Sequence, residues 1–386
     1  METTLERDAD WAAIEAKLPS NWRALAEAHK IIKTTGRGAK GKIRDSAVVL
    51  RIILHHVCSG AALKTTVGLA AAIFVTTISA PALHGWMCRA GGWIADLVAA
   101  MVGRAAAFAP ARWAGDDVIA VDATTVQRPG ALGITSRVHY ALRLFDLRAV
   151  AIHVTDVTVG ETLRNFAMGA RQLWVADRGY GNANSIAHAA AAQAAVLIRF
   201  AFGSLPLFNA AGRALDVRAL VQRVTKAGRC REWAVWIHPK GRDRIAARLV
   251  VMRLDTDQTA QARARLRREH KATDITPEMD ALAAYVVLVT TVPRATLATH
   301  VIIELYRLRW QVELDFKREK SIGELDALPN RKPETIHTWI CAKLLGLALA
   351  RRLAEPSEPF PPSVVGHYVL RPRLAHLGAL AARLRA

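Results

Sequence analysis

The spacing of hydrophobic residues divides the 386-residue chain into a helical first part and a mixed remainder. Up to about residue 110, apolar side chains recur every three or four positions, as in 21–32 and 46–56, which predicts amphipathic helices. The charge-free stretch from Thr65 to Cys88 contains Pro81 and several threonines, so we interpret it as a buried helical pair rather than a membrane span. Segments 61–72 and 79–87 of that stretch are compatible with a helix-turn-helix.

From residue 117 the pattern changes to short runs of β-branched residues, which predicts strands. Five strands are expected over 118–122, 137–145, 150–157, 173–177 and 195–200, with a short helical stretch after Gly160 and an alanine-rich helix over 184–195. Further strands are expected at 231–237, 244–252 and 284–290, around a charged helix at 258–270. A long helix over 296–321 and an apolar one over 335–353 follow, and the prolines of 355–362 forbid helix there.

The net charge of the chain gives the first indication of its binding partner. Lys and Arg number 53 against 33 Asp and Glu, a net charge of +20, and such an excess attracts polyanions because bound phosphates release counterions. The segment 33–44 holds five basic residues and three glycines, which suits either a phosphate-contacting loop or a solvated linker. Nucleic acid is the expected partner, with a membrane surface as the competitor.

The cysteines and the N-terminus indicate the compartment. The four cysteines are Cys58, Cys88, Cys230 and Cys341. They form no CxxC pair, which excludes a zinc finger and disfavours a disulfide framework. The acidic N-terminus has no apolar signal core. We therefore expect a cytoplasmic protein that is not associated with a membrane.

The order of elements, three strands, helix, strand, helix, strand, insertion and long helix, is that of a ribonuclease-H-like α/β core. In that fold the first and fourth strands are neighbours, so Asp122 and Asp177, each expected to end an apolar strand, would lie together. Two such carboxylates repel unless a cation lies between them, and Mg²⁺ or Mn²⁺ is the natural partner of oxygen ligands. Either aspartate alone is more typical of a strand-end cap.

The expected domains follow from this order. They are a helical DNA-binding domain at 1–110, the first part of the ribonuclease-H-like core at 111–200, a mainly β insertion at 201–295, the second part of the core at 296–354, and a C-terminal tail at 355–386.

The long helix places several polar residues on one face. At about 100° per residue, one face within roughly a quarter turn holds Tyr306, Arg309, Glu313, Lys317 and Lys320. Asp315 and Glu319 are expected to point the other way. An ordinary amphipathic helix with the ion pairs Arg309–Glu313 and Glu313–Lys317 is the simpler interpretation of the same pattern.

The spacing of Tyr306, Arg309, Glu313 and Lys320 resembles the Tyr-Arg-Glu-Lys signature of the DDE transposases founded on insertion sequence 4. Similar segments are Val121–Val126, Ala176–Gly181, Gly160–Glu161 and Arg309–Trp310. The resemblance covers roughly residues 60–350. The 136 residues between Asp177 and Glu313 leave room for the β insertion of such transposases.

The resemblance implies that Asp122, Asp177 and Glu313 ligate two Mg²⁺ or Mn²⁺ ions for strand cleavage and strand transfer. It also implies a phosphate grip, to which we assign Tyr306, Arg309, Lys317 and Lys320. Trp174 and Trp310 are expected in the core, with base stacking as the alternative. The implied partners are the terminal repeats of the element and target DNA, bound by a homodimer.

Two other functions of the same fold stay open. A metal-dependent nuclease without strand transfer would use the same carboxylates. A non-catalytic DNA-binding protein derived from a transposase is disfavoured because all three carboxylates are present. A peripheral membrane protein would need a basic amphipathic helix with exposed aromatic residues, and the sequence offers none.

Overall fold

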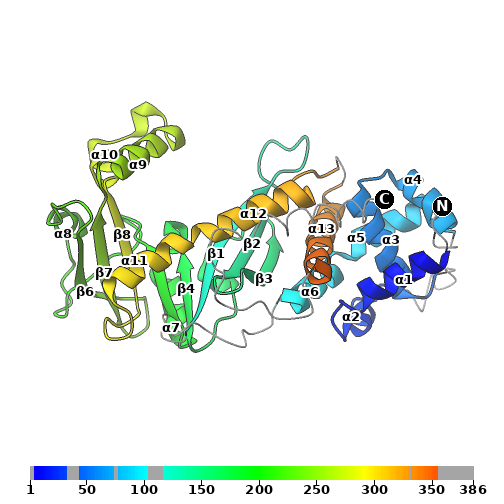
Figure 1. Cartoon of the computed structure of the whole chain (residues 1–386), viewed down its shortest axis with the longest axis horizontal. Helices are drawn as coiled ribbons and strands as arrows, with labels where there is room; N and C mark the ends of the chain where they lie inside the picture. Colours follow the sequence, from blue (N-terminus) through cyan, green and yellow to red (C-terminus); the bar gives the residue numbers. More distant parts are fainter. Residues whose placement is uncertain (1–3, 33–42, 74–76, 103–115, 330–331, 355–386) are drawn as a thin grey trace.

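The computed structural model describes residues 4–32, 43–73, 77–102, 116–329 and 332–354 (Figure 1). Within them, the N-terminal part is helical and comprises α1 (Thr4–Glu15), α2 (Trp22–Ala28), α3 (Ser46–Ser59), α4 (Leu63–Ile73), α5 (Ala80–Arg89) and α6 (Gly91–Val102). The helices expected over 21–32, 46–56 and 65–88 are therefore present. Most of the basic segment 33–44 lies outside the described residues.

Local capping explains where these helices begin and end. The carboxylate of Asp45 accepts a hydrogen bond from the N–H of Ala47 at 2.9 Å, and α3 ends at Gly60, whose φ of +64° favours glycine. The hydroxyl of Ser79 caps α5 in the same way. The pair α4 and α5 is only partly buried, through Thr66, Ala70, Leu83 and Met87. No described helix is both long and apolar enough to cross a bilayer.

The rest of the described chain is built on one mixed sheet of eight strands. They are β1 (Asp117–Val126), β2 (Ser136–Arg143), β3 (Arg148–Thr155), β4 (Gln172–Ala176), β5 (Ala195–Arg199), β6 (Cys230–Ile237), β7 (Ile245–Arg253) and β8 (Tyr285–Thr290). Their order across the sheet is β3-β2-β1-β4-β5-β8-β7-β6. The protein is thus mixed α/β with N-terminal helices.

The first five strands follow the expected order. β1, β2 and β3 are antiparallel neighbours, β4 is parallel to β1, and β5 is parallel to β4. The prediction that the first and fourth strands lie side by side is confirmed. The strands expected at 231–237, 244–252 and 284–290 continue the same sheet, because β8 pairs with β5. The predicted domain boundaries stay predictions.

Helices cover both faces of this sheet. The helices outside the N-terminal part are α7 (Ala183–Ala191), α8 (Val217–Gln222), α9 (Thr256–Glu269), α10 (Pro277–Leu282), α11 (Thr299–Leu308), α12 (Trp310–Gly323) and α13 (Pro333–Ala354), with short 3₁₀ turns at Leu163–Asn165, Arg178–Tyr180 and Ala272–Asp274. Of these, α9 and α10 bury no residue and project beyond the sheet. One core joins the N-terminal helices, α11 to α13 and one sheet face, and a second core lies on the other face under α7 and α8. Figure 1 shows α11 and α12 running along the sheet, with α13 between the sheet and the N-terminal helices.

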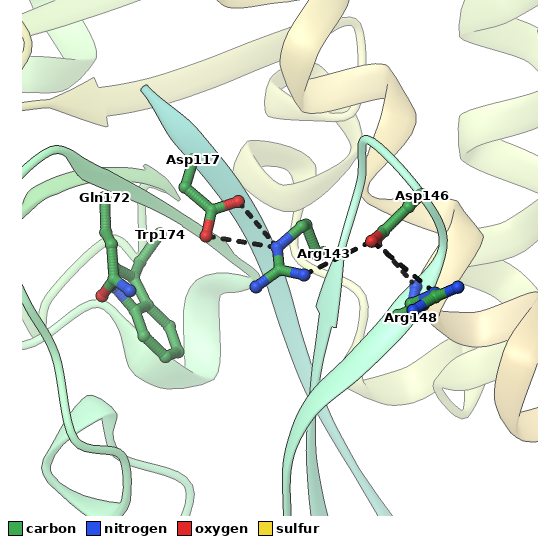
Figure 2. Close-up of polar contacts among 6 residues, drawn as sticks. All are labelled: Asp117, Arg143, Asp146, Arg148, Gln172 and Trp174. Carbon is green, nitrogen blue, oxygen red and sulfur yellow. Dashed lines mark hydrogen bonds and ion pairs between the residues drawn. The ribbon is translucent and has the colours of Figure 1, made fainter. Parts of the chain in front are cut away.

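A polar network fixes the end of the sheet where β1 begins (Figure 2). The buried guanidinium of Arg143, in β2, donates to the Asp117 carboxylate at 3.0 Å and to Asp146 at 3.3 Å. Next to it, Gln172 accepts from the indole N–H of Trp174 at 3.1 Å. β1 and β4 both begin at this network and run parallel to each other, so the C-terminal end of β4 lies beside the middle of β1.

Candidate active site

Asp122 and Asp177 lie at the far ends of neighbouring parallel strands. The last β1–β4 pair is Ala120 with Val175, and the same register, continued by two residues, sets Asp122 beside Asp177. Adjacent strands are about 4.8 Å apart. Asp177 directly follows β4, as expected. Asp122 does not end its strand, and that expectation is wrong: β1 continues to Val126 because its outer edge stays paired with β2.

Glu313 reaches the same place from the first turn of α12. α12 packs on β1 through buried Val312 and Phe316, and the Phe316 ring lies 5.0 Å from the ring of Tyr140, the β2 residue opposite Asp122. Asp315 points away from Glu313, as expected, and is buried against Tyr140 and Arg351. Packing on the sheet therefore determines where the Glu313 carboxylate lies.

The long helix expected over 296–321 is interrupted at Arg309, so its prediction as one regular helix is wrong. α11 ends at Leu308 and α12 begins at Trp310. The Arg309 N–H bonds to the Tyr306 carbonyl, and the Val312 N–H bonds to the Arg309 carbonyl, both at 3.1 Å and both three residues apart. This tightened turn is of the 3₁₀ kind. The turn lies at Arg309, whose side chain contacts Glu313 and approaches Asp122.

The Arg309 guanidinium connects the acidic side chains. It donates to the Glu313 carboxylate, and its Nη1 lies 3.8 Å from Oδ2 of Asp122. Its central carbon is 6.0 Å from the Tyr306 ring centroid. Burial alone would lower the pKa of Arg309, but Tyr306, Asp177 and Glu313 raise it above its ordinary value. Arg309 therefore remains a cation, and the ion pair that the sequence allowed as the simpler interpretation is formed.

The Asp122 carboxylate is held at an energetic disadvantage. Burial, together with the charges of Glu313 and Glu161, raises the pKa of Asp122 to about 6, against the lowering effect of the Ala123 N–H and Arg309. Burial also raises the pKa of Tyr306 to about 12, with the charge of Asp177 acting in the same direction. Negative charge thus exceeds the positive charge that Arg309 supplies.

Glu161 is a fourth acidic residue of this cluster, and sequence reasoning did not assign it to the site. Its charge acts on Asp122 and on Tyr180. A Cβ on Gly179 would lie 2.7 Å from Oε2 of Glu161, so any larger residue there would force the Glu161 carboxylate to shift. The Gly160–Glu161 pair was noted as similar to a family segment, and that was the one signal in the sequence.

Two buried oxygens in this cluster have no hydrogen-bond partner among the described residues: Oδ1 of Asp177 and the hydroxyl of Tyr180. Tyr180 is fully buried, and burial raises its pKa above the ordinary value. Buried oxygens normally bind a donor or a cation. Carboxylate oxygens are the ligands that Mg²⁺ and Mn²⁺ prefer, so the unsatisfied Oδ1 of Asp177 fits such an ion.

The remaining predicted residues differ in their exposure to solvent. Tyr306 is beside Arg309, whereas Lys317 is exposed and Lys320 half-buried further along α12, and neither lysine has an ion pair or hydrogen bond within the described chain. Trp174 is in the core, as expected. Trp310 is 47% exposed, so its expected place in the core is wrong. It occupies the first turn of α12, beside Arg309.

The helix α9 contributes a cation that the sequence did not indicate. The charges of Glu313 and Asp177 both act on Arg265, which pairs with Glu269 at 2.6 Å. None of the α9 side chains is buried, so Arg265 is a cation near the carboxylates that solvent can reach. Arg265 is distant in sequence from Asp177 and Glu313, because α9 belongs to the segment between β7 and β8.

Comparison with known proteins defines the class. The family model described as a transposase DDE domain matches residues 113–349, well over half of the chain. The chain therefore belongs to the DDE-domain transposase family.

Individual relatives agree with this membership. The putative transposase InsL for insertion sequence element IS186A of Escherichia coli is 30% identical over 362 residues, covering 90% of this chain and 97% of that protein. The transposase for insertion sequence element IS421 of Escherichia coli is 30% identical over 363 residues, with the same coverage. A structure of the piggyBac transposase synaptic complex with hairpin DNA aligns at 7% identity and a TM-score of 0.44, over 96% of this chain and 77% of that one.

Proposed function

We propose that this chain is the transposase of an insertion sequence, and that Asp122, Asp177 and Glu313 hold two Mg²⁺ or Mn²⁺ ions at which DNA strands are cut and joined. The observations that support the proposal are that Asp122 and Asp177 come from neighbouring parallel strands and that Arg309 links Asp122 with Glu313. In addition, the buried Oδ1 of Asp177 has no hydrogen-bond partner among the described residues. The order β3-β2-β1-β4-β5 supports a ribonuclease-H-like core.

The metal ions would activate the attacking water or 3′-hydroxyl and stabilise the leaving 3′-oxygen. The protein's part is to keep Asp122 ionised, which its pKa of about 6 allows at neutral pH. Arg309 offsets part of the negative charge of Glu313 and Asp122. With cations bound, its planar guanidinium becomes available to a phosphate of the DNA end, which it can hold through two hydrogen bonds.

Around this centre, α12 offers the rest of the DNA contact. Tyr306, Lys317 and Lys320 follow the spacing of the insertion-sequence-4 signature, and we assign them to phosphates beside the cut. Trp310, exposed next to Arg309, offers an indole face on which a displaced base can stack. The net charge of +20 suits binding of element ends and target DNA by a homodimer.

The test is a pair of substitutions on the helix, assayed on a labelled fragment that carries the element's own end. Glu313→Gln should lower Mg²⁺-dependent nicking at least about 100-fold, since even outer-shell partners of a metal contribute up to that factor. Its DNA binding should be kept, because the variant removes a negative charge near the phosphates. Glu304→Gln, the same chemical change at an exposed position of α11, should behave as wild type.

Arg309→Ala should have the opposite profile. End binding should weaken by about tenfold, the free energy of one or two hydrogen bonds to a charged group, while the carboxylates all remain. If both variants lose binding equally, the proposed division of roles is wrong. Nicking without any joining of the labelled end to a target plasmid would favour a nuclease of the same fold. Binding without nicking in the wild type would favour a non-catalytic DNA-binding protein.

A further inference from the structure

A second cluster of ligand atoms lies far from the carboxylates, where α5 meets the start of α13. His84 and Cys88 are four residues apart on α5 and so share one face of that helix. Glu334 reaches them from the first turn of α13. One ligand atom from each of the three side chains lies within 4.8 Å of the other two. Figure 1 shows α5 next to α13, with the sheet on the other side of α13.

The geometry suits a tetrahedral metal. With a Zn–S bond of about 2.3 Å and a Zn–N bond of about 2.0 Å at a tetrahedral angle, the sulfur and nitrogen should be about 3.5 Å apart. The Cys88 Sγ and His84 Nε2 are 3.7 Å apart. Thiolate, imidazole and carboxylate are all ligands of Zn²⁺. The exposed Glu334 can close the remaining distance by a change of rotamer.

The backbone around the cluster is fixed by contacts that need no metal. The hydroxyl of the fully buried Thr338, one turn after Glu334, donates to the Met87 carbonyl at 2.6 Å. Gly91, the first residue of α6, lies against α13: a Cβ there would be 2.5 Å from Nδ1 of His337. The three ligands are therefore presented on a prearranged frame.

We propose that His84, Cys88 and Glu334 bind one Zn²⁺ ion, with the fourth position open to water. On binding, the Cys88 thiol releases its proton to solvent and its sulfur becomes a metal ligand. Lys332 and Arg89 lie near enough to act on the thiol and offset part of the negative charge of Glu334. The ion would fasten the N-terminal helices to α13, the helix whose Arg351 supports Asp315 behind the catalytic helix.

The chain contains a matched pair that lacks a third ligand. His337 and Cys341 have the same spacing on α13, and their Nε2 and Sγ are 3.6 Å apart. Cys341 is 1% exposed, and burial raises its pKa to about 12. No carboxylate or further histidine joins this pair in the described residues. We therefore expect metal binding at Cys88 and not at Cys341.

The test uses Co²⁺ as a spectroscopic probe on the full-length, untagged protein. A thiolate ligand gives Co²⁺ a near-ultraviolet charge-transfer band, which carboxylates do not, so metal at the DNA-cutting site does not contribute. Wild type and the control Cys230→Ser should show the band at one Co²⁺ per chain, and Zn²⁺ should abolish it. Cys88→Ser should lack it and bind Zn²⁺ at least about tenfold more weakly.

His84→Gln and Glu334→Gln provide a second measurement should Cys88→Ser fail to fold. Zn²⁺ should raise the melting temperature of wild type and Cys230→Ser, and raise it less in both variants. The absence of a thiolate band in the wild type would overturn the proposal, as would a band that survives Cys88→Ser. DNA nicking is not used as a readout, so failure here is separable from failure of the proposed function.

Discussion

At the scale of single residues, the role of Arg309 depends on what it faces. The sequence allowed either an ion pair with Glu313 or a grip on phosphate, and the structure forms the ion pair. Arg309 can fill both roles one after the other. When metal cations bind the carboxylates, its guanidinium is released from them and can pair with a phosphate instead. The segments around Asp177 and Glu313 marked both residues in the sequence as candidate ligands, and that assignment stays a prediction. Glu161 was indicated only by the Gly160–Glu161 segment, and Arg265 by nothing in the sequence, since each acts on the other charges through contacts distant in sequence.

Asp122→Asn should stabilise the metal-free protein at high pH. The folded state raises the pKa of Asp122 from 3.8 to about 6, so it binds more protons than the unfolded state in that window. Wild-type stability must therefore fall as pH rises from about 4 to 6, and the loss persists above it. The shift corresponds to about 1–3 kcal/mol. Asparagine does not titrate and avoids the loss.

The measurement is urea unfolding of both proteins in chelator at pH 4 and pH 8. The two should differ little at pH 4, and the variant should be the more stable at pH 8. A variant that is less stable than wild type at pH 8 would show that the Asp122 charge is favourable in the folded protein.

At the scale of elements, the placing of α12 depends on a buried polar contact. Asp315, which is 3% exposed, accepts hydrogen bonds from the Tyr140 hydroxyl and, at 2.8 Å, from the guanidinium of Arg351. Periodicity predicted that Asp315 faces away from Glu313, but not which residues it meets. It also could not predict that β1 outlasts its pairing with β4 or that the helix tightens at Arg309, because strand pairing and local 3₁₀ turns depend on tertiary context.

Asp315→Asn should destabilise the protein strongly, because it leaves Arg351 without its partner charge. Breaking a buried ion pair costs about 3–5 kcal/mol, and the partial exposure of Arg351 reduces this to about 2–4 kcal/mol here. Tyr140→Phe keeps the ring packed on Phe316 and removes the hydroxyl that donates to Asp315 and accepts from Arg351, so it should lose about 1–2 kcal/mol. Urea unfolding of the two variants at neutral pH measures both. Equal, near-zero losses would mean that α12 is held by apolar packing alone.

At the scale of the whole molecule, the order of the first five strands followed from the sequence because each is a separate apolar run between turns. The joining of β6, β7 and β8 to the same sheet did not, since no pattern in the chain specifies that β8 pairs with β5. The continuous core from the N-terminal helices through α13 to the sheet is a second long-range feature. It connects the expected DNA-binding helices to α12, which carries Glu313. The net charge of +20 belongs to the molecule as a whole, and α9 brings part of it to the site.

The central claim is that Asp122, Asp177 and Glu313 share one metal site, and mapping that site with iron tests it most directly. Fe²⁺ bound in place of Mg²⁺, with ascorbate and peroxide, generates radicals that cut the backbone beside the metal. The account predicts cuts near residues 122, 177 and 313 together, suppressed by excess Mg²⁺ and lost in Glu313→Gln. Cuts near 84–88 or 334 would belong to the second cluster and should persist in that variant. Mg²⁺-sensitive cuts confined to one of the three segments, or unchanged in Glu313→Gln, would contradict the shared site.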